Sequence, residues 1–282
     1  MMEMSLLRPG LYRIRPTARG RLAALFRRHA QLAWLWLPLI LVTPARADVA
    51  DVVDAIKPGV VGVGVFSPTA SPRGSVQGTG FAIHDGRHIV SCAHLFAREL
   101  DPAKQETFAV FIGGDSQMKV RPAQVLAVDA ARDLALLRID GAPLPALKLG
   151  DSTRAREGWQ LYFTGYPLGT VLGLNPSTHR AGLAAIIPIF TPRPTAGQLD
   201  ARAIKAAADA YEVFELDGVA YPGNSGSPVW HPETGEVLGV VNSVYVKGTK
   251  EAAIVTPSGI SYAIPARYIR ALLDAALATS LR

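Results

Sequence analysis

Most of the chain consists of short apolar runs separated by glycine, proline and aspartate. The runs cover residues 60–66, 80–83, 89–92, 108–112, 134–139, 159–163, 183–187 and 237–246. Short apolar runs between turn-forming residues are typical of β-strands. Long helical patterns would alternate with the strands in βαβ units, and no such alternation is found. The pattern therefore predicts an all-β sandwich or barrel.

Three segments depart from this pattern and favour helices. Residues 48–57 form a short helix that Pro58-Gly59 ends, with one apolar face made by Val49, Val52, Val53 and Ile56. Residues 198–211 are alanine-rich and predict a surface insertion, and residues 266–281 predict an amphipathic helix that closes the fold. No linker is long enough to separate independent domains.

The first 47 residues have the organisation of a secretory signal peptide. A basic stretch ends at Arg27-Arg28-His29, an apolar run covers residues 30–42, and residues 45–47 (ARA) offer a small-x-small cleavage site. This run is shorter than the roughly 20 apolar residues that a bilayer span requires. We predict cleavage before Asp48, a periplasmic or secreted protein, and no stable membrane span once the signal is removed. A retained leader is the alternative.

The charge of the chain is concentrated in this leader. Residues 1–47 hold eight of the 29 basic residues and one of the 23 acidic residues, which leaves 21 basic and 22 acidic residues in the remainder. The formal net charge of +6 therefore does not indicate a nucleic-acid partner. The single cysteine, Cys92, excludes an intramolecular disulfide and is interpreted as a buried small residue. No spacing of potential ligands indicates a metal site, and no cofactor is expected.

Residues 221–228, YPGNSGSP, carry the most specific chemical signal. A serine between glycines in a tight turn can expose its hydroxyl, while the N–H groups of Gly223 and Ser225 can converge to form an oxyanion hole. His94 ends one predicted strand and Asp133 begins another, where a partly buried carboxylate needs a hydrogen-bonding partner such as an imidazole. The order His, Asp, Ser is one of three known for catalytic triads. We predict a triad of His94, Asp133 and Ser225.

Six motifs in this order resemble the protease domain of the HtrA/Deg-type serine proteases, which are trypsin-like. They are GTGF at 78–81, SCAH at 91–94, DLALL at 133–137, GYPLG at 165–169, PGNSG at 222–226 and GISYAIP at 259–265. The resemblance implies an all-β fold of two six-stranded β-barrels of the chymotrypsin-like type, with the same triad between them. It also implies a serine endopeptidase that hydrolyses unfolded or misfolded exported proteins through an acyl-enzyme.

The resemblance sets the expected domain limits and leaves two alternatives open. We expect a protease domain over residues 48–282, with barrels at about 58–150 and about 151–265 and the closing helix at 266–281. Ser227 stands where HtrA-type enzymes usually have a second glycine, and PDZ-dependent regulation is not expected. The serine-rich turn also resembles glutamyl endopeptidases, although their substrate-binding histidine is missing from residues 239–244, GVVNSV. A protease-like chaperone or binding module without hydrolysis is the other alternative.

The same resemblance locates the primary specificity pocket. In trypsin-like enzymes the residue six positions before the nucleophile forms the pocket floor, and this position is Val219. Asn242 and Val244 are predicted to add the wall. Because the floor is apolar, small or medium apolar substrate side chains are expected. Polypeptides are the expected partners, and assembly into a homo-oligomer is left open.

Overall fold

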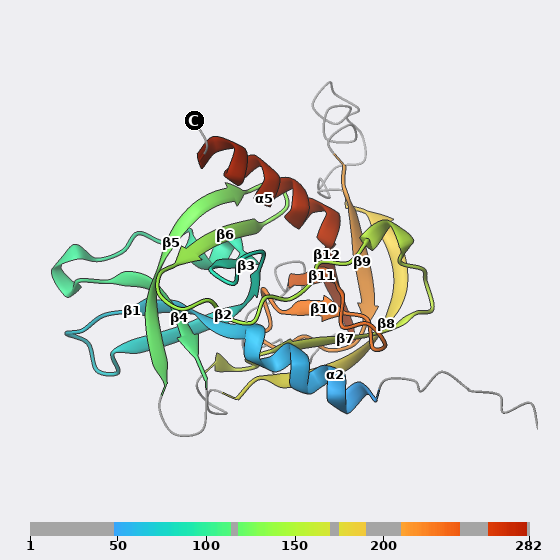
Figure 1. Ribbon diagram of the computed structural model, residues 1–282, viewed down its shortest axis with the longest axis horizontal. Helices are drawn as coiled ribbons and strands as arrows, with labels where there is room; N and C mark the ends of the chain where they lie inside the picture. Colours follow the sequence, from blue (N-terminus) through green and yellow to red (C-terminus); the bar gives the residue numbers. More distant parts are fainter. Residues whose placement is uncertain (1–47, 114–117, 170–174, 190–209, 243–258, 281–282) are drawn as a thin grey trace, which may run out of the picture. The chain divides into compact units, whose positions relative to one another are not determined.

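The computed structural model describes residues 48–113, 118–169, 175–189, 210–242 and 259–280 (Figure 1). The chain divides into residues 1–45 and one compact unit of residues 46–282, which contains all of the described residues. Within the described part of the chain, no helix is both long enough and apolar enough to span a membrane. The predicted signal peptide and nearly all of the 198–211 segment lie outside the described residues.

The first element of this unit is the helix α2, Val49–Ile56, as the sequence pattern predicts. The carboxylate of Asp48 accepts a hydrogen bond from the N–H of Ala50 at 3.0 Å and so caps the helix. A 3₁₀ turn over Lys57–Gly59, with proline at its second position, ends it. The apolar face packs against the core, which fixes the start of the first strand.

Six antiparallel strands form a first closed barrel in the order β1-β2-β3-β6-β5-β4. They are β1 Val60–Phe66, β2 Gly74–Ile83, β3 His88–Cys92, β4 Thr107–Ile112, β5 Lys119–Asp129 and β6 Leu134–Ile139. β1, β3 and β6 are buried along nearly their whole length, which explains their continuous apolar sequences. β5 instead alternates between exposed and half-buried residues.

Six further antiparallel strands close a second barrel in the order β10-β11-β12-β9-β8-β7. They are β7 Gln160–Gly165, β8 Ser177–Pro188, β9 Glu212–Asp217, β10 Pro228–Trp230, β11 Val237–Asn242 and β12 Ile260–Pro265. The two barrels confirm the predicted all-β fold. The sequence limits proposed for each barrel and for the whole domain remain predictions.

One hydrophobic core joins the two barrels. It combines Phe81 and Val90 of the first barrel with Trp230 and Val240 of the second, and all four are fully buried. The helix α5, Ala266–Ser280, contributes Ile269 to the same core and contacts β5 and β6 as well as β11 and β12 (Figure 1). The predicted closing helix is therefore confirmed, and it holds the barrels together from one side.

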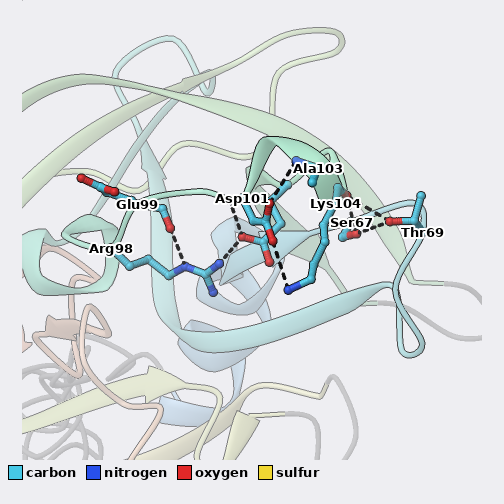
Figure 2. Close-up of polar contacts among 8 residues, drawn as sticks. Ser67, Thr69, Arg98, Glu99, Asp101, Ala103 and Lys104 are labelled. Atoms are coloured by element: carbon cyan, nitrogen blue, oxygen red, sulfur yellow. Dashed lines mark hydrogen bonds and ion pairs between the residues drawn. The ribbon is translucent and has the colours of Figure 1, made fainter.

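A polar network fixes the segment that leads from β3 to β4 (Figure 2). The hydroxyls of Ser67 and Thr69, which follow β1, donate to the carbonyl of Lys104 at 2.6 and 3.2 Å. Arg98 forms an ion pair with Glu106 within the segment. These contacts tether both ends of a stretch that begins just after the 3₁₀ helix η3, Ala93–Phe96.

Candidate active site

His94 and Asp133 lie side by side and hydrogen-bond twice. His94 belongs to the 3₁₀ helix η3, Ala93–Phe96, which follows β3 directly. Its backbone N–H donates to Asp133 Oδ1 at 2.7 Å, and its ring Nδ1 lies 2.6 Å from Asp133 Oδ2. A carboxylate oxygen only accepts, so Nδ1 carries the proton and Nε2 is left as an acceptor. The pair thus defines both the tautomer and the orientation of the imidazole.

The backbone of Asp133 has a left-handed conformation with φ of 55°. Aspartate tolerates this region better than most residues. Its carbonyl accepts from the N–H of Ala93 at 3.1 Å, so the turn before β6 is tied to η3 through main chain and side chain together. Backbone held in a sparsely populated region is common at functional sites.

Asn242, predicted from the sequence as a pocket residue, directs a hydrogen bond at Asp133. Its Nδ2 donates to Asp133 Oδ2 at 3.0 Å, and the residue is fully buried at the end of β11. Sequence reasoning missed this contact. An ionised carboxylate offers about four acceptor sites, so a donor beyond the histidine was to be expected. The side chain therefore helps to hold the carboxylate that faces His94.

The turn around Ser225 lies between β9 and β10 and is built on positive-φ glycines. Gly223 has φ of 98° and Gly226 has φ of 89°. The N–H of Asn224 donates to the carbonyl of Tyr221 at 2.9 Å, and that of Gly226 donates to Val241 at 2.8 Å. Within the described residues, neither the N–H of Gly223 nor that of Ser225 has an acceptor. These two groups are thus free to bind an anionic oxygen.

The Ser225 turn is seated on the first barrel next to the strand that leads to His94. The N–H of Thr79 in β2 donates to the carbonyl of Ser225 at 2.9 Å. A Cβ at Gly226 would lie 1.9 Å from the carbonyl oxygen of Thr79, so only glycine fits. Ser91 of β3 donates to the same Thr79 carbonyl at 2.6 Å. No hydrogen bond joins the Ser225 hydroxyl to the His94 ring in the described part of the chain.

The predicted specificity pocket is only partly described. Val219 is half-buried, and the adjacent N–H of Ala220 donates to the hydroxyl of Ser261 at 2.8 Å. Asp217, two residues before Val219, is exposed at the end of β9. Val244 lies outside the described residues. The roles of Val219, Asn242 and Val244 in the pocket therefore stay predictions.

Cys92 is an inert neighbour of the candidate site. Its thiol is fully buried and donates to the carbonyl of Val241 at 3.3 Å. Burial, reinforced by the charge of Asp133, raises the pKa of the thiol well above its usual value. The donor atoms of Cys92, His94 and Asp133 lie within 4.8 Å of one another, close enough to be tested as metal ligands. A protonated thiol and an imidazole already bonded to a carboxylate favour the hydrogen-bonded arrangement over metal binding.

A second histidine, His179 of β8, predicts a pH dependence of stability. Its ring stacks on that of Phe163, with 5.0 Å between the ring centroids, and its buried Nε2 has no hydrogen-bond partner among the described residues. Burial lowers its pKa below the ordinary 6.5. The unfolded chain therefore binds the proton more tightly, and the free energy of unfolding should fall as the pH drops from about 7 to about 5.

Denaturant unfolding at several pH values measures this dependence. A His179→Phe variant should show a shallower loss of stability than the wild type over the same range. Exposed His84 provides the control, because His84→Asn removes a histidine that is not buried. Equal slopes for the wild type and His179→Phe would show that burial of His179 is not the cause.

Comparisons with known proteins concern the family and the fold of the chain. The model of the trypsin-like peptidase domain family matches residues 78–240. A probable periplasmic serine endoprotease, DegP-like, from Marinomonas sp. is 27% identical over 75% of this chain and 38% of its own length. A protein of the same description from Pseudomonas putida F1 is 28% identical over 69% of this chain and 35% of its own. The chain thus spans little more than a third of the length of these relatives.

Solved structures share the fold. The HtrA-type protease AlgW with tripeptide is similar with a TM-score of 0.54 and 21% identity, covering 80% of this chain and 61% of that one. The active form of the Rv3671c protease from M. tuberculosis has a TM-score of 0.57 and 23% identity, covering 79% of this chain and 82% of that one. At this level of identity, the similarity establishes the chymotrypsin-like double barrel and not the details of the site.

Proposed function

The chain belongs to the trypsin-like peptidase domain family, and from this premise we propose that it is a serine endopeptidase with His94, Asp133 and Ser225 as its catalytic triad. One observation carries the proposal. His94 is locked to Asp133 by contacts of 2.6 and 2.7 Å, next to a serine turn whose Gly223 and Ser225 N–H groups are unpaired within the described residues. Acyl transfer needs these parts together.

In the proposed reaction, the Ser225 hydroxyl attacks the carbonyl carbon of the peptide bond while His94 Nε2 takes its proton. The N–H groups of Gly223 and Ser225 stabilise the oxyanion of the tetrahedral intermediate. His94 then delivers the proton to the departing amine, which leaves an acyl-enzyme. Water, deprotonated by the same nitrogen, hydrolyses this ester and restores Ser225. Asp133 stabilises the charged imidazole throughout.

We also propose the cellular setting and the substrate class. The relatives are named probable periplasmic serine endoproteases. The predicted leader of residues 1–47 would likewise export this chain to the periplasm. Unfolded or misfolded exported polypeptides are the proposed substrates, because an extended chain can reach a nucleophile that is only 6% exposed.

Labelling with a fluorophosphonate probe tests the proposal. The probe reacts with a serine only when a base and an oxyanion site are assembled around it, so an adduct on Ser225 is expected, with none in a Ser225→Ala variant. Mass spectrometry locates the adduct. Failure of the purified protein to react under any condition, combined with binding of unfolded chains, would favour the alternative of a binding module without hydrolysis.

The proposed pocket predicts cleavage after valine, alanine, isoleucine or leucine. Val219 at the floor offers no charge to pair with lysine, arginine or an acidic side chain, while each buried methylene gains about 0.8 kcal/mol. Mass spectrometry of the products from a reduced, denatured protein maps the cleavage sites. A Val219→Asp variant should gain cleavage after lysine and arginine.

Two product patterns would contradict this prediction. A majority of wild-type cuts after lysine or arginine would mean that Asp217 lines the pocket and that Val219 does not. A majority of cuts after glutamate would favour the glutamyl endopeptidase alternative. The products that the wild-type enzyme releases from the same substrate under the same conditions serve as the reference for Val219→Asp.

A further inference from the structure

Thr79 connects the first barrel to the serine turn through its backbone and its side chain. Its N–H donates to the carbonyl of Ser225 at 2.9 Å. Its hydroxyl donates to the carbonyl of Gly223 at 2.7 Å and accepts from the N–H of Tyr166 at 2.9 Å. The residue is fully buried. A single hydroxyl therefore bridges β2, the serine turn and the loop that follows β7.

The serine turn has little other side-chain support. Asn224 is fully buried, yet neither polar atom of its side chain has a hydrogen-bond partner in the described part of the chain, and the same holds for the hydroxyl of Ser227. Within the described residues, Thr79 is the only side chain that donates a hydrogen bond to residues 221–226. Besides the backbone hydrogen bonds of the turn, this hydroxyl is thus the side-chain donor that holds it within the described residues.

The bond acts next to the N–H groups that are proposed to bind the oxyanion. The carbonyl of Gly223 belongs to the peptide between Gly223 and Asn224, so it separates the N–H of Gly223 from that of Ser225. Gly223 has φ of 98°, and glycine populates many other conformations at little cost. Holding its carbonyl restricts that freedom, and with it the directions of the N–H groups on either side.

The Thr79 hydroxyl lies where the β7 strand packs closely against the serine turn. A Cβ at Gly165 would lie 1.9 Å from the Ser227 hydroxyl and 2.8 Å from that of Thr79, so the strand and the turn are in direct contact. Thr79 Oγ1 donates one hydrogen bond to a carbonyl there and accepts another from an N–H group, as a hydroxyl can. Valine has the same shape but offers neither a hydrogen-bond donor nor an acceptor.

We propose that Thr79 is a positioning residue for the oxyanion site, which it aligns through the Gly223 carbonyl; this inference rests on the proposed endopeptidase function. Thr79 does not touch the substrate. Loss of its hydroxyl should therefore weaken binding of the transition state more than binding of the substrate. A misalignment of about 1 Å in a catalytic site costs on the order of 10²-fold in rate.

The Thr79→Val variant tests the proposal with a peptide substrate and a peptide boronic acid, whose tetrahedral adduct places an oxygen in the oxyanion site. The variant is expected to lower kcat by about 10- to 100-fold with KM within about two-fold, and to weaken boronate binding by the same factor as kcat/KM. Thr79→Ser, which keeps the hydroxyl, should restore both.

Thr164→Val is the matched control. Thr164 is equally buried, and its hydroxyl also has two partners, Trp230 Nε1 at 3.0 Å and the Thr178 hydroxyl at 3.0 Å, neither of which belongs to residues 221–226. It should lose thermal stability but retain kcat. If Thr79→Val does not fold, Thr79→Ala and Thr79→Ser form the decisive pair, because both lack the methyl group and only serine keeps the hydroxyl.

The outcomes separate the two proposals. A wild-type protein that neither cleaves peptides nor reacts with fluorophosphonate contradicts the endopeptidase function itself. An active wild type with unchanged kcat and boronate affinity in Thr79→Val, or with equal values for Thr79→Ala and Thr79→Ser, overturns the role of Thr79 alone. The same holds if Thr164→Val loses kcat to the same extent.

Discussion

Replacing Ser225 by alanine is expected to abolish hydrolysis of an unfolded protein substrate while the fold is retained. Loss of a triad nucleophile typically removes about 10⁶ in kcat, roughly 8 kcal/mol of transition-state stabilisation. The substitution leaves the backbone contact between Ser225 and Thr79 unchanged. The Ser225 hydroxyl makes no hydrogen bond within the described residues, so its removal should hardly alter the melting temperature. Substrate cleavage and thermal unfolding measure the two effects.

Ser227 offers a control from the same turn. Its hydroxyl is buried and has no hydrogen-bond partner among the described residues, so Ser227→Ala removes the same atom two positions away without removing the proposed nucleophile. This variant should stay active. Residual activity of Ser225→Ala above a few per cent of the wild type, with Ser227→Ala as the active reference, would contradict the triad.

The fold could be predicted where the strands are buried on both sides. β1, β3, β6 and β11 are continuous apolar runs, and each appears in the sequence pattern. β5 does not, because its exposed residues alternate with half-buried ones and it contains Pro122. β10 is only three residues long, too short for any periodicity to be visible. What decides these strands is their pairing within a closed barrel, which local sequence does not contain.

The candidate site likewise has residues that the sequence predicts and contacts that it does not. The chain order and the motifs predicted His94, Asp133 and Ser225, and the structure places His94 against Asp133. Asn242 and Thr79 could not be assigned their contacts, because Asn242 meets a residue 109 positions away and Thr79 meets one 144 positions away. Both contacts cross from one barrel to the other. They depend on how the barrels pack, whereas the triad residues are marked by local motifs.

Asp133→Asn is expected to lower kcat by about 10⁴ with little change in KM. The left-handed backbone at φ of 55° accepts asparagine, so the turn should persist. Oδ1 accepts from the His94 N–H, and Oδ2 faces His94 Nδ1 and Asn242 Nδ2. An amide matches only one of these oxygens.

Either orientation of the new amide disrupts the site. With its oxygen toward the His94 N–H, its NH₂ group opposes the Asn242 donor and forces His94 to accept at Nδ1, so that Nε2 carries a proton and cannot take another from Ser225. With the amide reversed, its NH₂ group opposes the His94 backbone N–H. Asp129→Asn is the control: Asp129 pairs with Arg132 at 2.8 Å, and its substitution should leave kcat unchanged. If folded Asp133→Asn keeps more than about a tenth of the wild-type kcat, the carboxylate does not orient the histidine during catalysis.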